Sequence, residues 1–352
     1  MSAVETVVTR SEHDVAGPFF EDLHVGLRAD AAPGLTLTEG HAAAHQAILG
    51  GRLRLALEAG LAREVTGAAA PLVHPQLVCD VAIGQSTLLT QRVIANLFYR
   101  GLAFRRLPVI GDTLRTSTEV VALRQTSAKP GRAATGLAAL RIRTVDQQER
   151  AVLDFHRCAL LPLRDPDART GRADELDAVG AGELDAAALA GAVADWRLDA
   201  FRAAVPGGHA AELATGTVWT IGDGDVVSSA PELARLSLNV AAAHHDAAST
   251  ASGRRLVYGG HTIGLAAAQA TRALPNLVAI LAWHGCDHLA PVFEGDTLTS
   301  RLELERIEPL PGGEASDGAL VHLRSRVRAR RADLAGDATD EVLDWRFAAV
   351  MA

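Results

Sequence analysis

Asn239-Val-Ala-Ala-Ala-His244-His245-Asp246 lies in the second half of this 352-residue chain, and a copy without its polar groups lies in the first half. That copy reads Gly51-Arg-Leu-Arg-Leu-Ala56-Leu57-Glu58, so a glycine and an alanine replace an amide and an imidazole. The pair predicts a duplicated fold in which one copy keeps chemical groups and the other serves as scaffold.

Three further segments recur at similar spacing. Pro108-Val-Ile-Gly111-Asp112-Thr113-Leu114 matches Pro291-Val-Phe-Glu-Gly295-Asp296-Thr297-Leu298, with the glycines 184 residues apart (295 − 111). Residues 152–155 recur as 342–345, and Leu77-Val78 recurs as Leu256-Val257. Changes in loop length explain the small differences in offset, so we infer a tandem duplication.

Composition restricts the class of protein. The apolar fraction of 48% and the charged fraction of 22% are ordinary for a globular protein. A net charge of −8 argues against a nucleic-acid partner, which needs a basic face. The three cysteines have no zinc-ligand spacing, and no apolar run approaches the roughly 18 residues that span a bilayer. The chain starts without a signal-peptide pattern, so we expect a soluble cytoplasmic protein without a membrane partner. We also expect neither a metal nor a redox cofactor.

The periodicity of apolar residues changes along each half. Residues 35–65 have helical spacing with Thr38 as a candidate N-cap, and 77–92 read as a longer apolar helix. Strand-like segments then follow between about 96 and 162. In the second half, Ser229-Ala-Pro231-Glu232 predicts a capping box, residues 262–273 an Ala-rich helix, and residues 278–351 several strands. The Gly-Asp-Thr-Leu segments read as turns whose Asp and Thr side chains bond the local backbone.

A sheet wrapped around one buried helix is the hot-dog fold, so the predicted class is α+β with two hot-dog units in tandem. We expect a loose lead at 1–18, a degenerate unit at 19–163, a linker with short helices at 164–215, and a chemically equipped unit at 216–352. The two units should pack side by side, because each sheet edge would otherwise remain unpaired.

These motifs together resemble those of the MaoC-like, (R)-specific enoyl-CoA hydratases over nearly the whole chain. The resemblance is to the double hot-dog branch, which includes the mesaconyl-CoA (β-methylmalyl-CoA dehydratase) group and mycobacterial proteins. It rests on the Asn239–His244–Asp246 spacing, the Val-x-Gly that enters a helix, and the Pro-Val-x-x-Gly-Asp-Thr-Leu segment. It implies a hydro-lyase that acts on a 2-enoyl-CoA, with CoA as part of the substrate. The family usually has Asp where this chain has Asn239, and Asn where it has Ala241.

Hydration of an enoyl thioester requires a base for water and donors for the enolate oxygen. We expect His244 to move the proton and Asn239 to orient the water, because an amide cannot carry the proton itself. An N–H of Gly259 or Gly260 at a helix start would meet the enolate, and the sequence leaves this choice open. Supporting groups are Asp246, which could fix the imidazole ring, and His261. His284 and His288, just before a strand turn, are expected at the surface or an interface.

Two other functions remain open on the same fold. Asn239 and Ala241 favour a non-catalytic acyl-CoA-binding protein, and a thioesterase would need a carboxylate that faces the thioester. A homodimer is possible. The apolar copy around Gly51, Leu53 and Ala56 suggests the hypothesis that the first half enlarges the acyl pocket.

Overall fold

The computed structural model describes residues 15–127, 133–311, 314, 317–331 and 339–352, so most of the predicted lead at 1–18 lies outside the described residues. The first half contains η1 (Phe20–Asp22), β1 (Arg28–Ala29), β2 (Leu35–Thr36), α1 (Glu39–Leu49), α2 (Arg54–Leu57), α3 (Ala59–Thr66), α4 (Pro75–Gln85), η2 (Ser86–Thr90), β3 (Ala95–Phe104), β4 (Thr113–Gln125), β5 (Thr135–Val145) and β6 (Ala151–Pro162). The region between the two halves contains the short helices α5 (Ala186–Gly191), α6 (Leu198–Ala204) and η3 (Ala210–Glu212).

The second half repeats the sequence of elements. It contains β7 (Val218–Val226), α7 (Ala230–Leu236), η4 (Ala242–His244), η5 (Ala247–Ser249), α8 (Gly259–Ala273), β8 (Leu277–His288), β9 (Thr297–Pro309), β10 (Ala319–Arg330) and β11 (Thr339–Met351). The predicted α+β class and the tandem hot-dog architecture are confirmed. Within the described residues, no helix has both the length and the apolar character needed to cross a bilayer.

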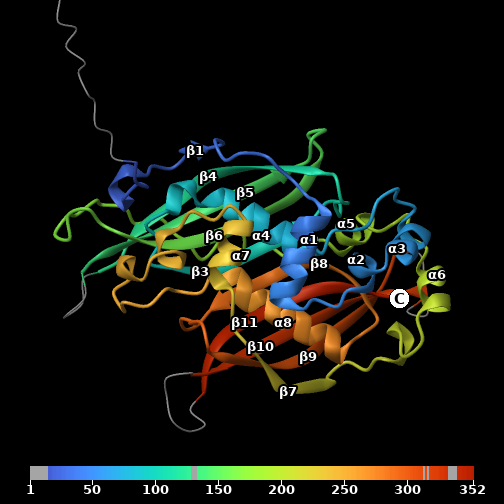
Figure 1. Ribbon diagram of the computed structural model, residues 1–352. Coiled ribbons are helices and arrows are strands. Elements are labelled where there is room, and N and C mark those ends of the chain that lie inside the picture. Colours follow the sequence, from blue (N-terminus) through green and yellow to red (C-terminus); the bar gives the residue numbers. More distant parts are fainter. Residues whose placement is uncertain (1–14, 128–132, 312–313, 315–316, 332–338) are drawn as a thin grey trace, which may run out of the picture.

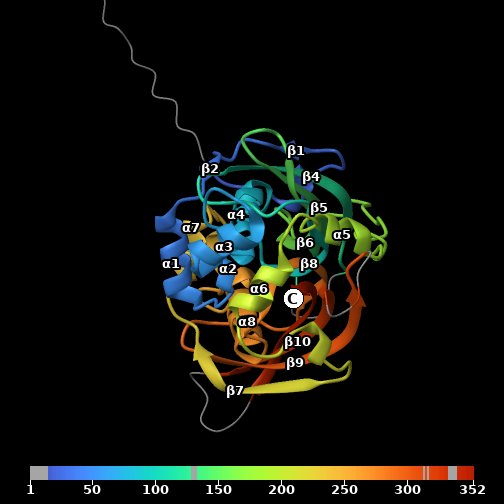
Figure 2. The same ribbon diagram turned by 90° about the vertical axis from the view of Figure 1, so that its right-hand side faces the viewer.

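The two halves share one 11-stranded antiparallel sheet. Its strand order is β1-β4-β5-β6-β3-β8-β11-β10-β9-β7, and the eleventh strand, β2, pairs with β4 off this path. Strand β3 pairs with β8 where the halves meet, for example Phe98 with Asp287 and Ala103 with Ala282. Figure 2 shows this sheet as an arc that runs from β1 and β4 to β9 and β7 around the helices. The pairing removes one exposed edge from each half, as expected for two units that pack side by side.

The two central helices, α4 and α8, lie inside the arc (Figures 1 and 2). Every residue of α4 is buried, which explains why its sequence is apolar on all sides rather than amphipathic. Pro75 occupies its first turn, where a missing N–H costs no hydrogen bond, and the His74 ring accepts from the Gln76 N–H. The helix is therefore fixed by burial and by its N-terminal residues.

Equivalent hydrogen bonds establish the duplication at a constant offset. The Gln85 side chain donates to the Leu114 carbonyl at 3.0 Å, and Gln269 donates to Leu298 at 2.9 Å. The amide of Val73 bonds the carbonyl of Pro108 as that of Val257 bonds Val292, both at 3.0 Å. The match of Leu77-Val78 with Leu256-Val257 is therefore wrong by five residues, because the equivalent of Val257 is Val73.

The predicted helix caps have different outcomes. The Thr38 hydroxyl accepts from the His41 N–H and caps α1, as expected. Helix α7 begins at the predicted place, but Ser229 has a φ of 57° and makes no side-chain cap. The Glu294 carboxylate instead accepts from the Ala230 N–H at 3.1 Å. The predicted capping box at Ser229 is therefore wrong, because Glu294 from another loop supplies the acceptor for the Ala230 N–H.

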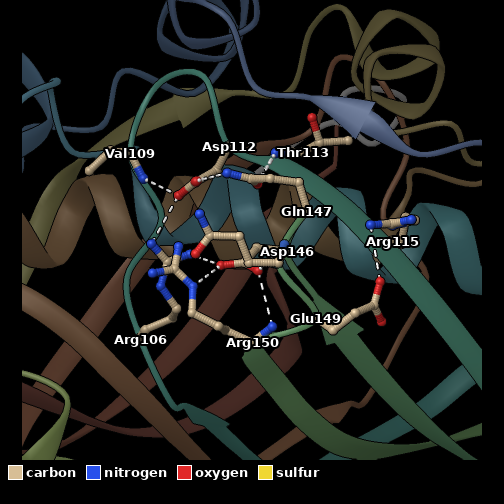
Figure 3. A network of polar contacts seen from close by, with 10 residues as sticks. Arg106, Val109, Asp112, Thr113, Arg115, Asp146, Gln147, Glu149 and Arg150 are labelled. Carbon is tan, nitrogen blue, oxygen red and sulfur yellow. Dashed lines mark hydrogen bonds and ion pairs between the residues drawn. The ribbon is translucent and has the colours of Figure 1, made fainter.

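The Gly-Asp-Thr-Leu turns are built around a carboxylate. The Asp112 carboxylate accepts from the Val109 N–H at 3.0 Å and from Arg106 at 3.1 Å, and Figure 3 draws both bonds as dashed lines. In the second half, Asp296 accepts in the same way from the Phe293 N–H. The prediction of local backbone bonding is confirmed for the aspartates. The Thr113 hydroxyl differs, because it bonds the Thr36 hydroxyl on the neighbouring strand.

Candidate active site

One cavity of about 400 Å³ lies between the halves and brings three of the six predicted site residues together. Asn239, His244 and Gly259 line it from the second half, together with Tyr258 and His288. The first half contributes η2, β3 and β6, including Thr87, Thr90, Tyr99 and Arg157. No aspartate or glutamate is among the described residues that line this cavity. Ile94 and Leu289, 45% and 53% exposed, form part of its rim.

His244 has its ring fixed by the backbone. Its Nδ1 lies 2.8 Å from the Leu256 carbonyl oxygen, and a carbonyl can only accept, so Nδ1 carries the hydrogen. Nε2 is then the basic nitrogen. Burial lowers the pKa of His244 to about 4, so the ring is neutral near pH 7 and available as a base. The ring also contacts Tyr258 edge-on, with centroids 5.7 Å apart.

The loop after α7 positions Asn239. Its amide N–H donates to the Ala234 carbonyl at 2.9 Å, and Leu238 before it has a φ of 61°. The side-chain Oδ1 accepts from the Ala241 N–H at 2.9 Å. The side-chain NH2 has no hydrogen-bond partner among the described residues, so its donors are available to a molecule in the cavity. The neighbouring His245 ring bonds the Asn239 carbonyl oxygen at 2.7 Å and steadies the same loop.

The surroundings of the two candidate glycines show which of them faces the cavity. Gly259, the first residue of α8, lines the cavity, and a Cβ there would lie 2.6 Å from His288 Nε2. At Gly260 a Cβ would lie 2.2 Å from Oδ1 of the buried Asp80. Gly260 is therefore packed against α4 and does not line the cavity. First-turn N–H groups lack partners inside a helix, so Gly259 offers the donor on the cavity side.

Neither predicted supporting residue has the expected position. Asp246 is exposed, and its carboxylate accepts from the Ala248 N–H to cap η5. The contact that we expected with the ring of His244 is made by the Leu256 carbonyl instead. His261 is fully buried, does not line the cavity, and has no hydrogen-bond partner in the described residues for either ring nitrogen.

The hypothesis about the apolar copy also needs correction. Gly51, Leu53 and Ala56 do not line the cavity. Leu53 is buried in the core, and a Cβ on Gly51 would lie 2.6 Å from the His74 ring. The space where a second site would be is therefore filled with packed side chains. The first half shapes the cavity through its central helix and strands instead.

Two residues of the cavity were missed from the sequence. His288 was expected at the surface or an interface, without a role in the site, but it lines the cavity, where burial lowers its pKa to about 4. Arg157 was not considered, although its strand contained a signal. Leu153, Phe155 and Ala159 are buried at alternate positions of β6, and Arg157 shares their parity. A cation on the inward face of a strand predicts either a buried ion pair or a ligand site.

Buried neutral histidines should make the protein sensitive to mild acid. Burial lowers the pKa of His74 to about 3 and of His244 and His261 to about 4, whereas unfolded histidines titrate near 6.5. Between these values only the unfolded chain binds the protons, so stability falls as pH decreases from about 6.5 toward 4. Each histidine contributes up to about 1.4 kcal/mol per pH unit. Thermal melts should show a constant Tm at pH 7–8 and a falling Tm below pH 6.5.

Two variants separate this effect from general acid denaturation. His261→Leu removes one buried imidazole and should make the fall of Tm between pH 6.5 and 5 shallower. His24→Leu, at an exposed position, should leave the slope unchanged. Equal slopes for the wild type and His261→Leu would contradict the assignment of His261 as a neutral group in the folded state.

Two tandem hot-dog units around one cavity, with an imidazole, an amide and a helix N-terminus facing it, define the MaoC-like double hot-dog class. The family model described as mesaconyl-CoA hydratase matches residues 1–283, so the chain belongs to this family. It is 30% identical to the β-methylmalyl-CoA dehydratase of Chloroflexus aurantiacus, with 84% of each chain covered. It is 29% identical to the mesaconyl-CoA hydratase of Cereibacter sphaeroides, with 90% of each covered.

A solved structure extends the similarity to the whole fold. The double hot-dog protein RV0216 of Mycobacterium tuberculosis, described as a conserved hypothetical protein, shares 54% sequence identity with this chain. The two superpose with a TM-score of 0.86, which covers 96% of this chain and 99% of that one. The resemblance inferred from the sequence motifs is therefore confirmed.

Proposed function

We propose that this protein catalyses the reversible addition of water to a 2-enoyl-CoA, with His244 as the group that moves the proton. The observation that carries the proposal is the bond from His244 Nδ1 to the Leu256 carbonyl, which leaves a neutral basic Nε2 in a cavity shared with Asn239 and Gly259. The family membership and the names of both relatives support this reaction class.

Bond formation at the β-carbon would use Asn239 and His244 together. The free NH2 group of Asn239 donates to the oxygen of a water molecule and holds it, while His244 Nε2 accepts one of its protons. The water oxygen then attacks C3, and the electron pair of the C2–C3 double bond moves toward the thioester carbonyl. The negative charge that develops on that oxygen meets the N–H of Gly259 at the positive end of α8.

The second half of the reaction returns the proton. The protonated His244 donates it to C2, so that water has added across the double bond and the imidazole is neutral again. A single imidazole is sufficient for both transfers, because the proton taken from water is the one that C2 needs. This sequence is compatible with Asn239 in place of the family's usual aspartate, since the amide orients water without titrating.

A non-catalytic acyl-CoA-binding protein is the second candidate, and Asn239 with Ala241 is the observation that favours it. The thioesterase alternative has less support, because the described residues that line the cavity provide no carboxylate to attack or activate water at the thioester.

A substrate panel separates the three functions. Purified protein is mixed with crotonyl-CoA, a longer 2-enoyl-CoA and mesaconyl-CoA, and the absorbance of the conjugated thioester is followed. A hydratase should remove this absorbance without releasing free thiol, which a thiol reagent detects. Thiol release would indicate a thioesterase. Binding by calorimetry without product from any ester would indicate the non-catalytic protein and would refute the proposed reaction.

A further inference from the structure

His288 lies at the end of β8, directly beside the N-terminus of α8. Its Nε2 would lie 2.6 Å from a Cβ placed on Gly259, so the ring packs against the residue that offers its N–H to the cavity. The Tyr99 ring of β3 also meets the imidazole, edge-on, with centroids 5.8 Å apart. The imidazole is therefore held between the central helix of the second half and a strand of the first half.

The two ring nitrogens of His288 have different surroundings. Nε2 is buried and has no hydrogen-bond partner among the described residues. Because the ring lines the cavity while Nε2 faces Gly259, Nδ1 is the nitrogen that a molecule in the cavity can reach. Burial lowers the pKa of His288 to about 4, so the ring is neutral near pH 7 and has one N–H to donate. A ligand can accept that hydrogen from Nδ1, whereas on Nε2 it would remain unpaired.

The first half lacks both donors at the equivalent positions. The constant offset of 184 residues makes Pro75 the equivalent of Gly259 (259 − 75) and Phe104 the equivalent of His288 (288 − 104). Proline has no backbone N–H, and the phenylalanine ring carries no polar group. Phe104 ends β3 as His288 ends β8, and it is fully buried. The fold therefore accepts an apolar ring at this position, and the imidazole is present only in the half that also has the helix N–H.

We infer that His288 is a catalytic residue whose Nδ1–H donates to the thioester oxygen of the substrate, as a second donor beside the N–H of Gly259. This inference rests on the proposed function. Donors aimed at an oxygen that becomes negative stabilise the transition state more than the bound substrate, and histidine side chains can serve as such donors. Nδ1 keeps its hydrogen throughout, so His288 takes no part in the proton transfers of His244.

His288→Phe tests the inference with the side chain that the first half has at this position. It keeps an aromatic ring against Gly259 and Tyr99 but removes the N–H. We expect kcat to fall about 10²- to 10³-fold, the usual cost of one oxyanion donor, while KM changes less than about threefold. The decay of enoyl-thioester absorbance, followed with the most active ester of the substrate panel, measures both constants.

Two conservative variants distinguish a donor from a ring that only fills space. The side-chain nitrogen of asparagine can take the place of Nδ1, and that of glutamine the place of Nε2. His288→Asn should therefore recover part of the kcat that His288→Phe loses, and His288→Gln should recover less. His284→Phe is the matched control, because His284 lies on the same strand but does not line the cavity. Its kcat should remain at the wild-type value.

Two kinetic results would overturn the inference. An unchanged kcat in His288→Phe, with the fold intact by circular dichroism, would show that the imidazole does not contact the reacting thioester. Equal losses of kcat in all three His288 variants, accompanied by equal losses of Tm, would make the ring a packing group at the start of α8.

Infrared spectroscopy of an unreactive ester keeps the test independent of the proposed reaction. Butyryl-CoA has no double bond to hydrate, and an isotope label on the carbonyl carbon identifies its thioester C=O stretch. A donor that polarises this bond lowers its frequency, so the frequency should be lower in the wild type than in His288→Phe. If no enoyl-CoA is turned over but this difference is present, the proposed reaction fails and the donor stands. If both proteins bind the ester and the frequencies are equal, the donor fails.

Discussion

Replacing His244 with glutamine should lower kcat for enoyl-CoA hydration by about 10²- to 10⁴-fold, the usual contribution of a general acid–base group. Glutamine has similar reach and can still donate to the Leu256 carbonyl, so the wall of the cavity is kept. It has no nitrogen that accepts a proton near pH 7. The loss should therefore appear in kcat more than in KM, measured by the decay of enoyl-thioester absorbance.

His24→Gln is the matched control, because the same substitution is made at an exposed histidine outside the cavity. It should leave kcat and Tm at wild-type values. An unchanged kcat in His244→Gln, with the fold intact by circular dichroism, would remove this imidazole from the mechanism. His288 would then be the next candidate, because it is another imidazole that lines the same cavity.

The sequence predicted the architecture because duplication leaves several independent marks. Segments that end in Gly-Asp-Thr-Leu have a structural reason to recur, since each aspartate accepts a backbone N–H of its own turn. Leu77-Val78 has no comparable structural role that would make it recur. Because apolar residues are frequent in this chain, a pair of them can match Leu256-Val257 by chance. Only the hydrogen bonds of Val73 and Val257 identify the true equivalents.

Those residues of the candidate site that a sequence motif specifies were predicted. Those that only tertiary contacts bring into the site were missed. Asn239, His244 and Gly259 are grouped by their motif and line the cavity. Asp246 was chosen for its proximity in sequence, but the partner of His244 is a carbonyl 12 residues further along the chain. No local pattern encodes such a contact. Arg157 comes from the other half, and only the strand parity of β6 pointed to it.

Gly84→Ala should both destabilise the protein and reduce its activity, because this glycine allows the Asn239 loop to touch α4. A Cβ at position 84 would lie 1.7 Å from the Ser237 carbonyl oxygen and 3.1 Å from the Asn239 nitrogen. Both atoms belong to the backbone, so no side-chain rotation relieves the overlap. The loop is also held by the bond from the Val240 N–H to the Thr87 hydroxyl at 3.0 Å. It can move only if that contact is strained.

The size of the effect follows from two opposing terms. Alanine is favoured over glycine inside a helix by about 1 kcal/mol. Overpacking against fixed atoms costs typically about 1–3 kcal/mol, and a backbone overlap this short lies at the upper end, so we expect a net loss of about 2 kcal/mol. Denaturant titration should measure this loss. A displacement of about 1 Å in a group that orients the reacting water can reduce kcat by about 10²-fold, so activity should fall further than stability alone explains.

Gly60→Ala provides the control for glycine replacement itself. Gly60 lies in α3, and a Cβ there meets no atom within 4 Å. Only the helix-propensity term remains, so this variant should gain about 0.5–1 kcal/mol and keep wild-type kcat. If Gly84→Ala behaved like Gly60→Ala in both measurements, α4 would not position Asn239. The first half would then contribute walls to the cavity but would not fix the group that holds the water.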